Sequence, residues 1–514
     1  VCGSRTLQAQ DFKLTSSGHF KIQGGDVMAF DDIYPEGHQG GVCIIMNGHR
    51  VATNGDIRLE ATPGQWQPVP KQLDRKLGDN SITATLCYPD SSRHLTGFNP
   101  MIYPDLHLIY TVNVESKGKN IEVTVDLDRP IPQEFIGKVG FNLENFPGSL
   151  FGKPWIMDGQ SGIFPQQPNS PLMTTQPNYL HTGNYHDGKK SLADMNKLIG
   201  KGYSPIVADD IISEPYAKGT KFTSRPDDPY NKVTIESLSG DLQLFDGRMN
   251  HNNGWFVLRS NIKPGVTKGA VKWIITPNVV ADWMYQPVIQ TSQIGYHPTQ
   301  DKEAVIEMDI RDNRKETAQI IRIDADGEKV VKNVTPANWG KFLRYNYLKV
   351  NFTDVKEPGL YKIKYNTSVS PIFRIDNDVY ARGVWQPVLE YFLPVQMCHM
   401  RVNEKYRVWH DCCHMDDAQM APAHNHIDGY DQKEGLSKFK PGEVVPGVNI
   451  GGWHDAGDFD LRIESQAGES YILALAYEAF HPNLDVTSID QINRVTEIHQ
   501  PDGKNDLLQQ VENG

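Results

Sequence analysis

The sequence predicts a multidomain protein in which two β-sandwich regions precede an all-α region. Its 514 residues exceed one typical domain, since a single domain usually has about 100–200 residues. Alternation with period two marks strands up to about residue 377, whereas apolar residues recur with a helical period from about residue 379. No run of about 18 apolar residues occurs, so the sequence predicts no membrane span.

The pattern of residues 1–285 predicts one large antiparallel β-sandwich. β-branched residues alternate along 106–114 and 121–127, and Asn-Gly and Asp-Gly pairs provide tight turns. This N-terminal domain is also a candidate for carbohydrate binding, because exposed aromatic rings can stack on sugars. The favoured interpretation is nevertheless that the aromatic residues concerned are core or turn residues; these are Trp155, Tyr185 and Trp255.

Residues 286–377 have the pattern of a second, smaller sandwich. Six or seven short strands in about ninety residues, each bounded by Pro, Gly, Asn or Asp, match the spacing of an immunoglobulin-like domain. The region contains no catalytic constellation, so we expect it to be scaffold. The expected strands are 288–296, 304–310, 319–324, 342–352, 359–365 and 371–375.

The remaining residues, 378–514, are expected to form helices. Val388, Phe392 and Val395 have helical spacing, although Pro394 should shorten or kink that helix. A broad apolar face predicts a second helix at 464–480, and a third is expected to begin near Asn505.

The most informative segment is Gly451-Gly-Trp-His-Asp-Ala-Gly-Asp-Phe-Asp460, immediately before the second helix. Asp455 and Asp458 are separated only by two small residues, so a tight turn can direct both carboxylates into one cavity. Two close carboxylates titrate together, and one can act as a base while the other orients water. Helix capping and calcium binding are alternatives for the same aspartates. Trp453 offers an aromatic face to a sugar ring, and we assign it with His454 to substrate binding.

This segment resembles the signature of glycoside hydrolase family 9, the inverting endoglucanases and related β-glucanases. Gln293-Ile-Gly-Tyr296 resembles the first strand of the immunoglobulin-like module that precedes the catalytic domain in many members, and 371–375 resembles its last strand. The resemblance covers 287–514. It implies that 378–514 is the N-terminal part of an (α/α)6 catalytic barrel.

By this resemblance Asp458 is the general base and Asp455 helps to hold the attacking water. Inversion also needs a proton donor, which in the family is a glutamate late in the barrel. Glu464 and Glu469 come too early in the chain to match it, so we expect residues 1–514 alone to be inactive. The rest of the barrel would come from the same parent polypeptide or from a companion chain. The implied substrate is a β-1,4-glucan such as cellulose, mixed-linkage glucan or xyloglucan.

Three of the six cysteines lie within sixteen residues, close to several histidines, and suggest a metal site. The spacing is not that of a zinc finger, so a pair of buried thiols beside surface histidines remains an alternative. Family 9 members with the immunoglobulin-like module often hold a structural zinc through a Cys, a Cys-His pair and a later His. The resemblance implies Cys398, Cys413, His414 and His426 as ligands, with His424 as the alternative to His426. Cys412 is a bystander, and calcium is a further expected cofactor whose ligands the sequence does not place.

Charge and composition restrict the other functions. The 51 basic and 63 acidic residues give a net charge of −12, which argues against a general nucleic-acid binder. The main alternative to an enzyme is a non-catalytic carbohydrate-binding protein with an inert barrel remnant. A zinc hydrolase is disfavoured, because no HExxH helix is present. A polysaccharide substrate and the signal-like Leu7-Gln-Ala9 lead us to expect a secreted, periplasmic or cell-surface protein.

Overall fold

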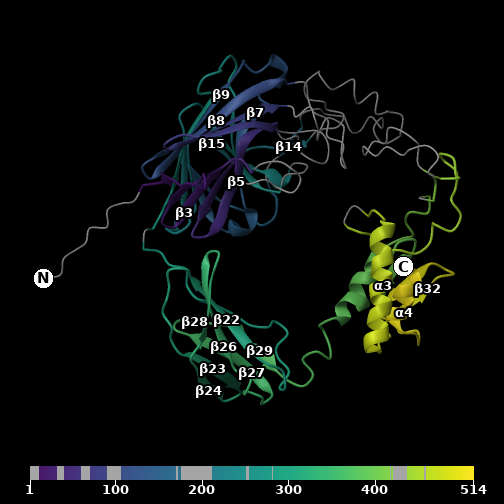
Figure 1. The fold of residues 1–514 in the computed structure, drawn as a ribbon. Helices are drawn as coiled ribbons and strands as arrows, with labels where there is room; N and C mark the ends of the chain where they lie inside the picture. Colours follow the sequence, from purple (N-terminus) through teal and green to yellow (C-terminus); the bar gives the residue numbers. More distant parts are fainter. Residues whose placement is uncertain are drawn as a thin grey trace. The chain divides into compact units, whose positions relative to one another are not determined.

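The computed structural model divides the chain into two compact units, one consisting mainly of Val1–Met284 and the other of Tyr285–His424 with Asp431–Gly514 (Figure 1). No helix among the described residues is long and apolar enough to cross a membrane. The structure describes residues 11–31, 40–59, 70–88, 106–169, 172–174, 211–249, 254–280, 282–416, 418–420, 437–456 and 459–514.

The N-terminal unit contains two nine-stranded sheets whose neighbouring strands pair antiparallel. The first sheet has the order β1 (Lys13–Leu14), β2 (Phe20–Ile22), β3 (Gly25–Ala29), β4 (Val42–Met46), β5 (His49–Leu59), β10 (Val139–Asn145), β19 (Phe256–Asn261), β18 (Leu242–Asp246) and β15 (Ala217–Gly219). The second has the order β12 (Gln160–Ile163), β11 (Pro154–Met157), β16 (Lys221–Ser224), β17 (Val233–Ser237), β20 (Val271–Pro277), β9 (Asn120–Leu127), β8 (Leu108–Lys117), β7 (Ser81–Tyr88) and β6 (Lys71–Leu77). Short elements connect them: η2 (Gln133–Phe135), η3 (Pro147–Ser149), η5 (Gly247–Met249) and the hairpin of β13 (Leu172–Thr174) and β14 (Ile211–Ser213).

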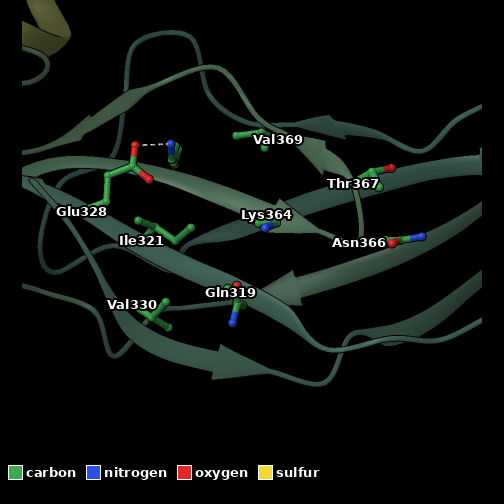
Figure 2. Close-up of a pocket in the computed structure, with 9 residues that line it drawn as sticks. Gln319, Ile321, Glu328, Val330, Lys364, Asn366, Thr367 and Val369 are labelled. Atoms are coloured by element: carbon green, nitrogen blue, oxygen red, sulfur yellow. Dashed lines mark hydrogen bonds and ion pairs between the residues drawn. The ribbon is translucent and has the colours of Figure 1, made fainter.

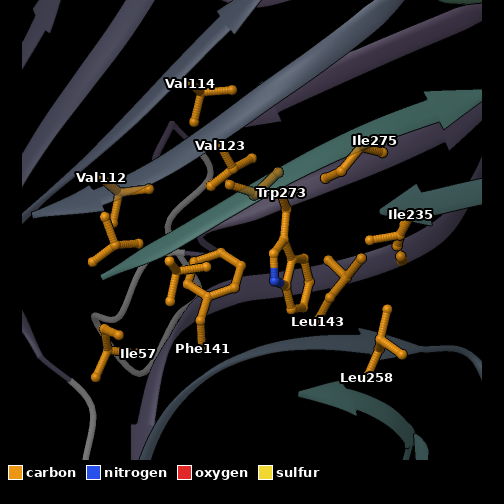
Figure 3. Packing of buried hydrophobic residues seen from close by; sticks show 14 of the residues in the cluster. Ile57, Val112, Val114, Val123, Phe141, Leu143, Ile235, Leu258, Trp273 and Ile275 are labelled. Carbon is orange, nitrogen blue, oxygen red and sulfur yellow. The ribbon is translucent and has the colours of Figure 1, made fainter. Parts of the chain in front are cut away.

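A single hydrophobic core fills the space between these sheets (Figure 3). Buried and half-buried residues alternate along β9 and β20, as the period-two pattern of the sequence requires. Trp273 lies at the centre with no exposed surface, and the edge of its ring meets Phe141 at 5.0 Å between centroids. Its indole N–H donates to Ser260 Oγ at 3.0 Å, so the polar edge of the largest core side chain is satisfied.

The next sandwich in the chain has the two sheets expected of an immunoglobulin-like fold. One has the order β21 (Val288–Gln290), β22 (Glu303–Asp309), β26 (Tyr345–Asn351) and β25 (Ala337–Phe342). The other has the order β24 (Gly327–Val334), β23 (Ala318–Asp324), β27 (Gly359–Tyr365) and β28 (Ser368–Val369), with β29 (Phe373–Ile375) also pairing with β27. The sequence did not predict β24 and β25, because their residues are mostly exposed and carry no alternation. The outer face of the second sheet has a shallow hollow lined by residues such as Ile321, Lys364 and Asn366 (Figure 2).

The prediction of an all-α region after residue 378 needs correction. Helical structure begins with a π-turn, η6 (Val388–Phe392), that leads into the single turn α2 (Leu393–Gln396), and Pro394 lies at the start of that turn. The longer helices are α3 (Ile463–Phe480) and α4 (Asp506–Asn513). A sheet of order β31 (Arg407–His410), β30 (Arg401–Glu404), β33 (Val495–Ile498) and β32 (Thr487–Asp490) lies beside them. The three α-helices and this sheet do not make a closed barrel in the described part of the chain.

The predicted helix at 464–480 and the predicted start near Asn505 are both present. The Asn505 side chain accepts hydrogen bonds from the backbone of Leu507 and Leu508, which caps α4. In α3 the apolar side chains on which the helix prediction was based are exposed: Tyr471 by 69%, Ile472 by 65% and Leu475 by 48%. The helix period is therefore correct, but the described residues do not bury this face.

Asp506, the first residue of α4, fixes that helix to β32. Its carboxylate accepts hydrogen bonds from the backbone N–H groups of Val486, at 2.8 Å, and Thr487, at 3.3 Å. Burial raises the pKa of Asp506 to about 6, and the negative charges of Asp485 and Asp502 act in the same direction. The folded state thus holds this proton more tightly than the unfolded chain, in which an aspartate titrates near pH 4.

We therefore expect the free energy of unfolding to contain a pH-dependent contribution from Asp506. The contribution is fully present below about pH 4 and is lost as the pH rises through about 6, with a size of about 3 kcal/mol. Asp506→Asn should remove this pH-dependent contribution, whereas Asp324→Asn in the immunoglobulin-like sandwich should leave it unchanged. Urea denaturation of both variants between pH 4 and pH 8 measures this, and an unchanged pH slope in Asp506→Asn would contradict it.

Candidate functional site

Two segments that are far apart in the sequence pair at the start of the glycine-rich segment 451–460. Met397 and Trp453 form an antiparallel bridge, which is flanked by the bonds Cys398 N–H to Gly452 O, 2.9 Å, and His454 N–H to Gln396 O, 2.8 Å. Gly452 has φ +80°, and a Cβ atom there would collide with the side chain of Gln466 on α3. Only glycine fits this backbone without strain. The pairing places Cys398 beside His454, 56 positions later in the chain.

Four sulfur and nitrogen side chains converge at this pairing. Cys398, Cys413, His414 and His454 each offer one atom, and these four atoms all lie within 4.8 Å of one another. Cys398 Sγ is 3.0 Å from His414 Nδ1 and 3.6 Å from Cys413 Sγ, while Cys413 Sγ is 3.2 Å from His454 Nε2. Within the described residues this is the one group of three or more such side chains close enough to hold a metal ion.

The protonation state of His454 suits metal binding. Burial lowers the pKa of His454 to about 4, and the neighbouring His410, His414 and His399 act in the same direction. The ring is therefore neutral at neutral pH, which is the form that ligates metals. Two thiolates and two imidazoles are the donor set of a closed tetrahedral site, which leaves no position for a reacting water.

Two further histidines secure the backbone around the cluster. His399 is 2% exposed, and its ring lies between the carbonyl oxygens of Gly451, at 2.9 Å, and His414, at 3.0 Å. His410 lies between the carbonyl oxygens of Asp411 and Val395, at 2.9 and 3.0 Å. The role of His399 was not predicted from the sequence, because it depends on carbonyl groups that only the folded chain brings together.

The carboxylate site is described in part. Asp455 is partly exposed, and its Oδ2 lies 3.3 Å from Nε of Arg462, which also pairs with Asp460 at 3.0 Å. Burial raises the pKa of Glu469 on α3, and the charge of Asp455 adds to the effect. Asp455 therefore lies among ionisable side chains of α3 and of the residue before it. The sequence did not predict the contact with Arg462. Asp458 lies outside the described residues, so its position and role stay predictions.

The other predicted site residues lie as follows. Trp453 is 2% exposed, its indole N–H donates to Gln510 Oε1 at 2.8 Å, and it packs in a small core with Met397. Trp453 is therefore a core residue in this structure, and His454 belongs to the Cys/His cluster. Neither has the exposed position expected of the predicted substrate-binding residues. His424 and His426 are outside the described residues, as is Tyr185. Of the aromatic candidates in the N-terminal unit, Trp155 is buried and stacks on Tyr216, while Trp255 is half-buried against Phe146.

Comparison with known proteins agrees with this architecture. Residues 284–370 match the model of the cellulase N-terminal ig-like domain. This range covers most of the smaller sandwich, so the immunoglobulin-like part of the resemblance to family 9 is confirmed. No curated protein matches the chain in sequence.

The structure is also similar to solved glycoside hydrolase family 9 structures over part of its length. A metagenome-derived family 9 endoglucanase has 24% identity and a TM-score of 0.33, over 44% of this chain and 39% of that one. A family 9 protein of Bacteroides ovatus has 20% identity and a TM-score of 0.32, over 44% and 38%. A zinc-binding triple mutant of the family 9 endoglucanase J30 has 23% identity and a TM-score of 0.31, over 42% and 37%. The matched part is thus about two fifths of the length of each of these proteins.

The cluster should bind a divalent metal through both of its thiolates. Titration with Co²⁺ is expected to give the sulfur-to-metal absorption band of a tetrahedral thiolate site. Cys398→Ser should abolish the band, whereas Cys412→Ser should leave it unchanged, because the Cys412 sulfur lies outside the cluster and is exposed. Equal cobalt spectra from the two variants would contradict the assignment.

Proposed function

We propose that this chain carries the base side of the active site of an inverting glycoside hydrolase that acts on β-1,4-glucans. The observation that supports the proposal most strongly is the order of parts. A cellulase-type ig-like domain at 284–370 is followed by the Gly-Gly-Trp-His-Asp-Ala-Gly-Asp segment at 451–458. Either feature alone would support the proposal less strongly, since an Asp-Ala-Gly-Asp sequence also suits a helix cap or a cation-binding turn.

In the proposed reaction, water attacks the anomeric carbon from the face opposite the leaving oxygen. Asp458 takes the proton from that water, and Asp455 accepts a hydrogen bond from it and holds it in line. A carboxylic acid on the other side protonates the leaving oxygen, with the two carboxyl groups roughly 6.5–9.5 Å apart. By the family resemblance this donor is a glutamate in the later part of the barrel, from the same polypeptide or a companion chain.

Arg462 has a supporting position in this scheme. Its guanidinium pairs with Asp455 and Asp460, on either side of the turn that carries Asp458. A cation between these two carboxylates offsets the repulsion that a cluster of acidic side chains would otherwise create. Arg462 therefore favours a turn in which the acidic groups remain ionised and close together.

The metal in this proposal is a structural zinc held by Cys398, Cys413, His414 and His454. Zinc takes two thiolates and two imidazoles in a tetrahedron, and bound at these residues it would supply a crosslink rather than a reacting water. His454 directly precedes Asp455, so an ion at the cluster would fix the backbone at the first carboxylate. We thus assign the fourth ligand to His454 instead of His426 or His424, which the resemblance had suggested.

The catalytic proposal predicts the effects of substitutions in the polypeptide that carries this segment. With cellohexaose as substrate, Asp458→Asn should lower kcat by about 10²–10⁴-fold, because a general base contributes about that much. Asp378→Asn, an exposed carboxylate elsewhere, should leave kcat unchanged. Proton NMR of the first products should show the α-anomer. A fully active Asp458→Asn variant, or β-anomer products, would refute the proposal.

The ligand assignment predicts a difference between two histidine variants. His454→Ala should lose stoichiometric zinc during dialysis, because it removes one of four donors, whereas His426→Ala should retain it. His454→Cys restores a donor and is expected to hold zinc. It shows whether His454→Ala loses zinc because a ligand is missing. Elemental analysis with zinc lost only from His426→Ala would reverse the assignment.

A further inference from the structure

A row of aromatic side chains lies on the outer face of the sheet β21–β22–β26–β25, in the immunoglobulin-like sandwich. Tyr345 and Tyr347 point outward from β26, since the residues between and beside them, Asn346 and Leu348, are buried. Ring contacts link these two with the other members of the aromatic row, which consists of Tyr285, Tyr345, Tyr347, Trp339 and Phe342.

Three of the four ring contacts in the aromatic row are edge to face, and the rings of Tyr285 and Tyr345 are tilted by 49°. The centroids of Tyr285 and Tyr345 are 5.0 Å apart, those of Tyr345 and Tyr347 6.1 Å, and those of Tyr347 and Trp339 5.6 Å. Trp339 meets Tyr347 at 88° and Phe342 at 89°, so its neighbours do not stack on its flat faces. Trp339 is 58% exposed and Phe342 56%, which is unusual for such large apolar side chains.

The backbone of β25 is irregular at the position that exposes Trp339. The register between β25 and β26 shifts between Asn338 and Gly340, so Trp339 is the extra residue of a β-bulge. Gly340 lies opposite Tyr347 with φ +126°, and a Cβ atom added there would meet nothing within 4 Å. The space on the side-chain side of Gly340 is therefore open. Bulges often redirect a side chain towards a binding site.

Polar groups lie among these rings. Glu307 on β22 is directly opposite Tyr347 and accepts hydrogen bonds from the hydroxyls of Tyr285, at 2.8 Å, and Tyr347, at 3.3 Å. Along the same face Glu303 pairs with Lys349 at 2.5 Å. The face therefore combines flat apolar rings with a carboxylate and two phenolic hydroxyls at the centre of the row.

This combination limits the kind of partner that fits. An apolar protein surface laid over the row would remove water from the Glu307 carboxylate, and desolvating a charge without new hydrogen bonds costs several kcal/mol. A polyhydroxylated chain offers donors to the carboxylate and also flat C–H faces to the rings. The hollow on the other sheet of this sandwich is lined by aliphatic, amide and charged side chains and by no aromatic ring (Figure 2).

We propose that the aromatic row is an auxiliary binding surface for a β-linked glucose chain, with Trp339 as the stacking platform and Glu307 as the central acceptor. The identity of the sugar rests on the function proposed above, whereas the stacking geometry does not. The surface would hold the polysaccharide independently of the carboxylates at the start of α3.

The test measures binding of cellohexaose by titration calorimetry in the Asp458→Asn background, where hydrolysis should be slowed by about 10²–10⁴-fold. Trp339→Ala should weaken binding by about tenfold or more, as expected for removal of an exposed aromatic anchor. Glu307→Gln should weaken it less. The matched control Trp385→Ala removes an exposed tryptophan outside the aromatic row and should bind as the parent does.

The outcomes separate this inference from the proposed function. If Trp339→Ala binds cellohexaose as tightly as its parent, or changes only the oligomeric state, the inference is wrong even where glucan hydrolysis is observed. If binding depends on Trp339 but no hydrolysis occurs in the enzymatic assay, the inference stands and the hydrolase proposal fails. Absence of any cellohexaose binding overturns the inference.

Discussion

The local structure of the candidate site depends on the pairing of the chain around Met397 with the chain around Trp453. Glycine is favoured at 452, because its φ of +80° would strain other residues and a Cβ atom there would displace the Gln466 side chain. The pairing buries Trp453 in a small core and places Cys398 beside His454. The next residue is Asp455, so the Cys/His cluster and the first carboxylate of the candidate site are held by one stretch of backbone.

Those parts of the fold that arise from local periodicity were predictable from the sequence. Alternating β8 and β9, helix α3 and the Asn505 cap of α4 all follow from patterns within a few residues. Strand β10 has no such pattern, since all its residues are buried, including Asn142 and Glu144. The small sheet containing β30 and β33 was also missed, because these strands pair in parallel across more than ninety residues.

The candidate site was predictable in its chemistry but not in all its members. Cys398, Cys413 and His414 were identified from residue type and order, and the structure brings them together. His454 was placed with the substrate, because its neighbours in sequence suggested a sugar site. Its burial beside Cys413 depends on a contact between positions 41 residues apart, which no local pattern reveals. Arg462 was not predicted either, although its partners Asp455 and Asp460 lie only seven and two positions before it.

X-ray absorption at the zinc edge of the intact, zinc-loaded protein tests the central assignment most directly. The account predicts two sulfur ligands near 2.3 Å and two nitrogen ligands at about 2.0–2.1 Å, with no bound water. In His454→Ala the zinc should be lost or should have one imidazole ligand fewer. A spectrum with oxygen ligands only, or one that is unchanged in His454→Ala, would contradict the assignment.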